Sequence, residues 1–376
     1  MTTDWEAFVE LKYEQALSTD KNVSIRGYAH HYGFKGAYPY EWDDELIDYF
    51  EQTSEYWGVV EGQFRWDTSP HNRLIVGSEY RRYINSHYKT WDEYEVYNEF
   101  YAPFSVFSVF AQNDYQVTPG LAVVVGLRHD QYSTVGGATT PRLGLIFNPF
   151  SSSTLKLLYG EAFRAPGAFE RKYEGDYFKP NPDLKPESIE TLEAVWEQRL
   201  TSNLSATVSV FDYTLHNLIE EGYDPDDERS MYQNTGEVEA QGIEAEINAR
   251  FEGGLSGYAS YTYQNARATQ TQAHLTNSPE HMVKAGITIP FLKQFFAAAQ
   301  MRYETGRLTL YETHTDAYTR ADIHLSTRRL FGHLSPSLLI RNVFDARYAL
   351  PGGYEHVQSA LVQDGRNVVF KVEIVF

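Results

Sequence analysis

One stretch of this sequence gathers side chains that could hold an anionic, partly apolar ligand. Residues 162–187 read AFRAPGAFERKYEGDYFKPNPDLKPE. Arginine presents a planar fork of donors that suits anionic acceptors, and aromatic side chains offer flat apolar faces. For any single residue here, an ordinary charge on a solvated loop is the alternative interpretation. The candidate ligand-binding residues are Arg164, Arg171, Lys172, Tyr173, Tyr177, Phe178 and Lys179.

The same stretch is predicted to be a long loop between two strands. Apolar residues recur at alternate positions before it, in residues 155–163, and after it, in residues 192–200. That alternation is the period of a β-strand. Four prolines lie in between (Pro166, Pro180, Pro182 and Pro186), and proline can neither donate to a strand ladder nor change its φ. A connection of about twenty residues is uncommon and usually functional.

Two other segments, residues 35–55 and 217–233, are strongly acidic. The second contains Asp224, Asp226, Asp227 and Glu228, whose oxygens could ligate Ca²⁺, a hard cation that needs several of them. The segment lacks the glycine-containing spacing of an EF-hand. A solvated external loop is therefore the favoured interpretation, and Ca²⁺ is the alternative.

Composition and motifs exclude several classes of function. The chain of 376 residues has no cysteine and a net charge of −19. A disulfide framework and a cysteine zinc site are excluded, and nucleic acid, which needs a basic face, is not an expected partner. The sequence has no hydrolase, zinc-protease or phosphate-loop pattern, so we expect no catalytic residues and no enzyme. His30 and His31 would point to opposite faces of a strand and cannot bind one metal together.

The remaining sequence reads as about 17 strands in a regular order. No run of about 18 apolar residues exists, so no transmembrane helix is expected. Short turns alternate with mostly long loops, which include residues 35–54, 85–101, 217–233 and 345–363. This sorting of connections is typical of an outer-membrane β-barrel. Within the acidic segment 35–55, apolar residues at roughly helical spacing predict one short helix.

The two faces of the predicted strands differ in chemistry. In residues 242–251, Ile243 and Ile247 lie on one face, and Glu244 and Glu246 on the other. The charged face must meet water, so the lumen of the barrel is expected to be polar and the apolar face to meet lipid. A soluble antiparallel sheet with one wet face is the alternative. However, about 17 strands with sorted loops are hard to close in a soluble sandwich.

Seven segments resemble a known family in the family's own order. The resemblance is to TonB-dependent outer-membrane receptors, and it covers the chain from about residue 73 to its end. It implies an all-β, transmembrane antiparallel barrel of about 22 strands with a plug domain inside. We therefore expect residues 1–376 to be a C-terminal barrel portion that lacks the plug and about five strands. The segments are GLRHDQY (126–132), TTPRLGLIFNP (139–149), LKLLYGEAFRAPGAFE (155–170), NPDLKPESIETLE (181–193), NTGEVEAQGIEAEI (234–247), IRNVFDARY (340–348) and QDGRNVVFKVEIVF (363–376).

The resemblance also implies a function and a location. It implies a receptor in the outer membrane of a Gram-negative bacterium that takes up a scarce metal chelate with energy from TonB. A ferric siderophore is the expected ligand, and cobalamin comes second. Haem receptors carry a histidine between two boxes that resemble FRAP (163–166) and NPDL (181–184) of this sequence. Residues 167–180 contain no histidine, so haem is a less favoured ligand. The expected partners are the chelate, TonB through the missing N-terminal part, membrane lipid, lipopolysaccharide and the barrel assembly machinery. A passive porin, which needs no plug, is the runner-up.

The final segment has an unbroken apolar face that ends in an aromatic residue. Such an ending resembles the signal by which the assembly machinery captures outer-membrane barrels through edge pairing. An ordinary closing strand whose last ring sits in the interfacial belt is the alternative. The residues of the expected assembly signal are Phe370, Val372, Ile374 and Phe376.

Deletion of Phe376 should separate these two interpretations. One interfacial side chain contributes little to a barrel that many contacts stabilise, so refolding in detergent should stay near normal. The yield in the outer membrane of cells should fall, because the assembly machinery would no longer recognise the strand. The measurement compares full-length protein with and without Phe376. Equal yields in cells would reject the signal.

Overall fold

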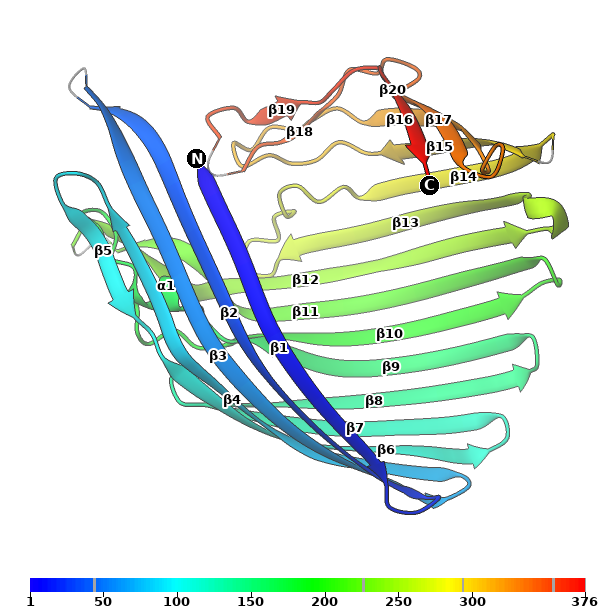
Figure 1. Cartoon of the computed structure of the whole chain (residues 1–376), viewed down its shortest axis with the longest axis horizontal. Coiled ribbons are helices and arrows are strands. Elements are labelled where there is room, and N and C mark those ends of the chain that lie inside the picture. The colour runs from blue at the N-terminus through cyan, green and yellow to red at the C-terminus, as the bar shows by residue number, and fades with distance from the viewer. Residues whose placement is uncertain (43–44, 225–226, 293, 354–355, 376) are drawn as a thin grey trace. The chain divides into compact units, whose positions relative to one another are not determined.

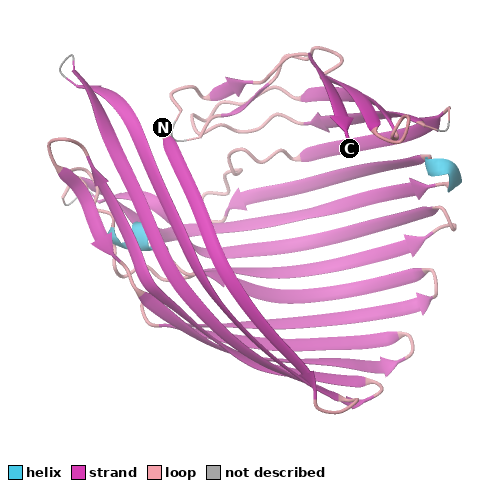
Figure 2. Cartoon of the chain, in the orientation of Figure 1, coloured by secondary structure: helices cyan, strands magenta, loops and turns pink. Residues whose placement is uncertain are grey.

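The computed structural model describes residues 1–42, 45–224, 227–292, 294–353 and 356–375. Strands make up most of these residues (Figures 1 and 2). None of the helices within them has the length and apolar character that a membrane span requires. The elements are β1 (Thr2–Ala16), β2 (Lys21–Trp42), β3 (Glu45–Ser69), β4 (Asn72–Trp91), β5 (Val96–Tyr101), β6 (Phe104–Thr118), β7 (Leu121–Tyr132), β8 (Gly136–Phe150), β9 (Ser153–Arg164), α1 (Ala168–Lys172), β10 (Glu187–Arg199), β11 (Leu204–Asp224), β12 (Arg229–Arg250), η1 (Glu252–Gly254), β13 (Ser256–Ala268), β14 (His281–Phe291), β15 (Phe295–Glu304), β16 (Tyr318–Thr327), β17 (Leu334–Arg341), β18 (Ala349–Pro351), β19 (Ala360–Val362) and β20 (Asn367–Ile374).

The predicted number of strands is confirmed. When the short β5, β18 and β19 are set aside, 17 strands remain among the described residues. The chain forms two compact units, and β8 to β12 contribute residues to both. Unit 1 comprises Met1–Leu145, Leu158–Glu190 and Leu215–Glu237, and unit 2 comprises Ile146–Leu157, Thr191–Thr214 and Val238–Phe376.

Unit 1 is an antiparallel meander of strands that follow one another in sequence. β1 pairs with β2, β2 with β3, and β3 with β4. β4 then pairs with β6, and β6 with β7. The short β5 folds back on the C-terminal half of β4 as an additional hairpin. This order follows from the short turns, since a tight turn can join only antiparallel neighbours.

Unit 2 continues the same pattern. β12 to β17 pair successively as antiparallel neighbours. β17 then pairs with β20, and the segment between them contains the separate β18–β19 hairpin. In both units, strands that have a partner on each side have their backbone groups satisfied by the neighbouring strands. That condition is required of any strand that meets lipid.

The helix predicted within residues 35–55 is absent from the described part of that segment, and this prediction is wrong. β2 continues to Trp42 and β3 begins at Glu45, with Tyr38 opposite Tyr49 and Tyr40 opposite Ile47. Ile47 is also one of the most buried apolar side chains, at 2% exposed. Pairing between the two strands therefore outweighs the local helical spacing, because the strand conformation depends on cross-strand partners.

Three other predicted loops are partly strand. β4 extends to Trp91 and β5 follows it, β11 extends to Asp224, and β12 starts at Arg229. The segment 345–363 contains β18 and β19. The sequences of these segments lack the sustained alternation of apolar and polar residues by which the other strands were recognised.

Large apolar side chains lie mainly on the surface. Among the described residues, seven hydrophobic side chains are buried, compared with 13 polar or charged ones. On β7, Val125 and Leu127 are 50% and 53% exposed, whereas Asp130 on the opposite face is 5% exposed. A fold in water buries its apolar face, but a face that meets lipid has no such need. The burial therefore supports the predicted distribution of lipid-facing and polar sides.

The C-terminal strand β20 also has exposed apolar side chains on one face. Phe370, Val372 and Ile374 share one face of β20 and are 67%, 45% and 50% exposed. Phe376 lies outside the described residues. The role of these four residues as an assembly signal stays a prediction.

Substitution on the two faces of β7 should have unequal effects. Val125→Arg places a charge on the apolar face and should lower the free energy of unfolding by about 2–4 kcal/mol in a bilayer. Val124→Arg is the matched control, because Val124 lies on the charged face, opposite Asp114 in the register; its effect should stay within about 1 kcal/mol. Urea titration of protein refolded in phospholipid vesicles measures both. Equal losses would contradict the assignment of the faces.

Candidate ligand-binding site

One arginine closes the base of the loop between β9 and β10. Arg164, the last residue of β9, donates to both carboxylate oxygens of Glu170 at 2.9 Å and to Glu187 at 2.5 Å. Glu187 is the first residue of β10. Arg164 therefore connects two strand ends with helix α1, and two carboxylates balance its charge. Its predicted contact with a ligand stays a prediction.

The short helix α1 begins directly after one proline and one glycine that follow the end of β9. Pro166 cannot continue a strand ladder, and the backbone N–H of Gly167 donates to Glu170 at 2.6 Å. This contact satisfies one of the free donors at a helix start. The helix ends at once, with the N–H of Tyr173 donating to the carbonyl of Phe169 at 2.9 Å. Glu170 thus serves both the helix start and Arg164.

Lys179 fastens the loop to the β11–β12 hairpin. Its ammonium lies 2.5 Å from Asp224 and 3.0 Å from Asp227. The backbone continues the attachment, because Lys179 donates to the carbonyl of Ser230 and Ser230 donates to that of Tyr177, at 2.9 and 2.8 Å. Hydrogen bonds to the two carboxylates raise the pKa of Lys179, and the lysine lowers the pKa of Asp227. The residue expected to attract an anionic ligand therefore already holds two anions.

The same contact bears on the Ca²⁺ alternative. Asp224 and Asp227 both face Lys179, and Asp226 lies outside the described residues. In the part of the chain that the structure describes, no group of three acidic or histidine side chains is arranged to hold a metal ion. Ca²⁺ at Asp224, Asp226, Asp227 and Glu228 stays a prediction.

Arg171 and Lys172 differ from Lys179 in having no ion pair within the described residues. Arg171 donates to the carbonyl of Pro182 at 3.1 Å, and Lys172 donates to that of Tyr101 on β5 at 2.8 Å. Each cation thus donates to a neutral carbonyl and is not engaged by a carboxylate in a described ion pair. These two residues are therefore the predicted cations that remain available to an anion.

Both side chains line a cavity of about 790 Å³ that belongs entirely to unit 1. β5 forms one wall, the loop after α1 forms another, and Arg229 at the start of β12 completes the lining. The hydrogen bond from the Asn98 side chain to the carbonyl of Glu174 joins the first two walls. The charged residues of the lining are Arg171, Lys172, Arg229, Glu99, Glu174 and Asp176.

Aromatic rings pack beside this cavity. Phe169 stacks on Tyr173 at 4.5 Å between ring centroids and meets Tyr88 edge to face at 5.5 Å. Phe178 contacts Tyr232 of β12 at 5.1 Å. The three predicted aromatic residues therefore have different environments. Tyr173 and Phe178 pack in this cluster, whereas Tyr177 is 83% exposed. All seven predicted ligand-binding residues lie in unit 1.

Sequence reasoning missed two parts of the site. Residues 97–100 of β5 and Arg229 line the cavity, although neither segment was a candidate. Residues 96–101 read VYNEFY and show no strand alternation, and their pairing with β4 includes a bulge between Thr90 and Trp91. Arg229 is the single base of an acidic segment, and only its position at the start of β12 directs it to the loop.

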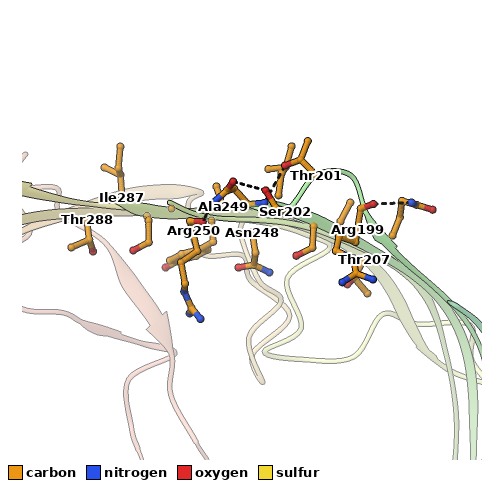
Figure 3. Close-up of a pocket in the computed structure, with 18 of the residues that line it drawn as sticks. Arg199, Thr201, Ser202, Thr207, Asn248, Ala249, Arg250, Ile287 and Thr288 are labelled. Carbon is orange, nitrogen blue, oxygen red and sulfur yellow. Dashed lines mark hydrogen bonds between the residues drawn. The ribbon is translucent and has the colours of Figure 1, made fainter. Parts of the chain in front are cut away.

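Unit 2 has its own cavity, of about 1020 Å³, next to the turns that join β8 to β9, β10 to β11 and β12 to β13. Its lining is rich in serine, threonine, asparagine and glutamine. In Figure 3, Thr207, Asn248 and Thr288 point to one side of the sheet, whereas Ile287 points to the other. The cavity is therefore a polar sheet face, suited to contact with water or a polar surface.

Loss of the Lys179 contact should loosen the central loop. Lys179→Met removes both ion pairs and should raise the rate of proteinase K cleavage beside the exposed Tyr177 by about 2- to 5-fold, the range expected for exposed pairs. Lys185→Met is the control, because the described contacts of Lys185 in the loop involve its backbone.

The contact should also depend on pH in one direction. Asp227 has a lowered pKa, so its contribution is complete above the unfolded value of 3.8 and is lost as the pH falls through the lower folded value. The rate of proteinase K cleavage of the wild-type protein should therefore be constant from pH 5 to 8, because this whole interval lies above the unfolded pKa of Asp227. A wild-type rate equal to that of Lys179→Met at every pH would contradict the role of the contact.

The sequence matches a family model and several known receptors and transporters. Residues 2–341 match the family model described as TonB dependent receptor-like, beta-barrel. A vitamin B12 transporter of Vibrio cholerae is 27% identical over 243 residues, which are 62% of this chain and 38% of the relative. The ferrienterobactin receptor of Escherichia coli is 28% identical over 169 residues, 39% of this chain and 22% of the relative. The chain thus spans at most about two fifths of the length of these curated relatives.

Solved structures agree in fold. The ferripyoverdine receptor of the Pseudomonas aeruginosa outer membrane, bound to ferripyoverdine, aligns with a TM-score of 0.79. The alignment covers 98% of this chain and 56% of that receptor at 16% identity. A copper transporter aligns with a TM-score of 0.76 at 15% identity and covers 99% of this chain and 65% of the other. At such identities the likeness establishes the β-barrel fold and leaves the ligand open.

Proposed function

This chain belongs to the TonB-dependent receptor β-barrel family, and on that premise we propose that it binds a ferric siderophore for uptake. Family members are receptors and transporters of the Gram-negative outer membrane, which is therefore the location of this chain. The chain spans only part of its relatives, so the activity of the whole protein is part of the proposal. We propose transport and no catalysis.

One observation carries the choice of ligand. Arg171 and Lys172 line the unit 1 cavity and form no ion pair among the described residues, next to the rings of Phe169 and Tyr173. An anionic chelate with apolar groups matches both features, since arginine pairs with carboxylate-like oxygens and aromatic rings bury apolar surface. The cavity volume of about 790 Å³ is within the range of small-molecule sites.

The alternatives fit the same cavity less well. Haem binding is disfavoured because no histidine lies among the residues that line it, although a hemin receptor of Yersinia pestis is 24% identical over 287 residues. Cobalamin remains the second candidate, because a vitamin B12 transporter is among the relatives. A passive porin requires no converging cations in an external loop, so the cavity favours a receptor.

We propose that uptake requires TonB and a plug domain outside residues 1–376, as the family membership implies. The polar cavity of unit 2 supports contact with such a domain, since hydroxyl and amide side chains form hydrogen bonds readily with another polar surface. Lipid and lipopolysaccharide would contact the exposed apolar face, and the barrel assembly machinery would receive β20.

Replacing Arg171 and Lys172 together by alanine should weaken binding of an anionic ferric chelate by about 10- to 100-fold, because two charge-assisted contacts are lost. Barrel assembly should not change, since both side chains lie in an external loop. The measurements are the dissociation constants of ferric enterobactin, ferric citrate and cyanocobalamin for the full-length receptor. Tighter binding of cyanocobalamin than of either ferric chelate would overturn the proposal.

Lys185→Ala provides the matched control, because it removes a loop cation that does not line the cavity. It should leave the affinity unchanged. If Lys185→Ala weakens binding as much as the double substitution, the effect is general electrostatic attraction and the site lies elsewhere.

A further inference from the structure

One arginine of unit 1 lies on the apolar face of the sheet. Side chains alternate between the two faces of a strand, so Arg82 shares a face of β4 with Tyr80, whereas its neighbour Arg81 lies on the other face. The register sets Tyr80 opposite Val60 of β3 and Phe107 of β6. These three side chains are 48%, 60% and 51% exposed. Arg82 therefore belongs to the side of the sheet that meets lipid.

Arg82 has no anionic partner on this face. Within the part of the chain that the structure describes, it forms no ion pair and no side-chain hydrogen bond. Arg81 differs, because it donates to Glu79 at 3.1 Å on the polar face. A cation next to lipid is costly unless an anion or water accompanies it. The neighbours of Arg82 on its own face, across β3, β4 and β6, are all neutral: Tyr56, Gly58, Val60, Tyr80, Ile84, Ser105 and Phe107.

The position of Arg82 along β4 determines which part of the membrane it meets. β4 begins at Asn72, directly after the short turn from β3, and the short turns of outer-membrane barrels lie on the periplasmic side. Arg82 lies ten positions after Asn72, and about 9–11 residues of a tilted strand cross the hydrocarbon layer. The guanidinium therefore lies at the outer boundary of the hydrocarbon layer, where the lipid head groups begin.

Aromatic side chains mark the same level on the neighbouring strands. Tyr56 lies two residues from Gly58, the residue opposite Arg82, and so shares its face. Tyr56 stacks on His31 of β2 with 3.9 Å between ring centroids, and Trp5 of β1 meets His31 edge to face at 6.1 Å. Tyrosine and tryptophan are enriched where membrane and water meet. These rings therefore support the placement of Arg82 at the head-group level.

The surface beside Arg82 has room for a small anionic group. Gly58, directly opposite on β3, has no side chain. Apart from the adjacent residues, the only heavy atom within 4 Å of a Cβ placed on Gly58 would be the carbonyl oxygen of Tyr28, at 3.7 Å. On the other side of Arg82, Ser105 of β6 offers a hydroxyl donor. An acceptor can therefore lie beside the guanidinium without displacing a side chain.

We propose that Arg82 binds the phosphate of a glycolipid in the outer leaflet, and that the acyl chains of this lipid lie on the apolar face beside Tyr80 and Phe107. The guanidinium offers two parallel N–H donors to phosphate oxygens. Pairing with an anion also lowers the cost of a charge at the edge of the lipid. Lipopolysaccharide is the partner to which the charge and the position of Arg82 point. An arginine that only extends into water is the competing explanation.

The test measures lipid binding to the full-length receptor in detergent by native mass spectrometry. The probe is diphosphoryl lipid A, and the comparison is the same lipid after enzymatic removal of its phosphates. The wild type should bind the phosphorylated lipid at least about 3-fold more tightly than the dephosphorylated one. Arg82→Gln should lower the affinity for the phosphorylated lipid by about 3- to 10-fold, because one charge-assisted contact is lost. Arg82→Lys, which keeps the charge, should retain most of the affinity.

Arg81→Gln is the matched control, because Arg81 is the adjacent arginine and lies on the polar face with Glu79. It should leave the affinity for lipid A unchanged. Equal affinities of the wild type for the two lipids, or equal effects of Arg81→Gln and Arg82→Gln, would overturn the proposal.

The outcome is independent of the proposed uptake function. A receptor that binds no ferric chelate but selects phosphorylated lipid A through Arg82 would keep the lipid site and reject the siderophore. A receptor that binds ferric chelates through Arg171 and Lys172 but does not distinguish the two lipids would keep the function and reject the lipid site.

Discussion

The structure depends on one requirement, that every backbone N–H and C=O of a strand facing lipid must find its partner in a neighbouring strand. Antiparallel pairing between consecutive strands meets this requirement for the strands that have a neighbour on each side in both units. The polarity of the side chains on each face can then match the medium, lipid or water, that this face contacts. This is why the chain shows few buried apolar side chains and a charged, hydrogen-bonded opposite face, the reverse of a fold that hydrophobic burial organises in water.

The same pairing extends beyond the lipid-facing region and builds the site. β2, β3, β4, β11 and β12 continue as long strands whose ends carry polar residues, and the central loop attaches to two of these hairpins. On one side Asn98 and Tyr101 of β5 hold the loop, and on the other Lys179 and Ser230 attach it to β12. The cavity therefore owes its shape to backbone and ion-pair contacts and keeps Arg171 and Lys172 for a ligand.

Cations of one loop thus have different roles that their residue type does not reveal. Arg164 has two carboxylates within 2.9 Å and Lys179 has two within 3.0 Å, so both hold the loop in place. Arg171 and Lys172 donate only to carbonyls among the described residues. Electrostatic attraction of an anion depends on this net local charge, because a compensated pair produces little field at a distance.

The sequence by itself determined the antiparallel all-β architecture, the number of long strands, the sorting of faces and the position of the central loop, because each depends on local alternation and on prolines. It misjudged residues 35–55, where cross-strand pairing of Tyr38 with Tyr49 decides against the helical spacing. Only the tertiary structure decided which cations are paired, since Asp224 and Asp227 lie more than forty positions from Lys179. It also decided which aromatic rings stack across unit 1, because rings from five strands meet there only through the strand register.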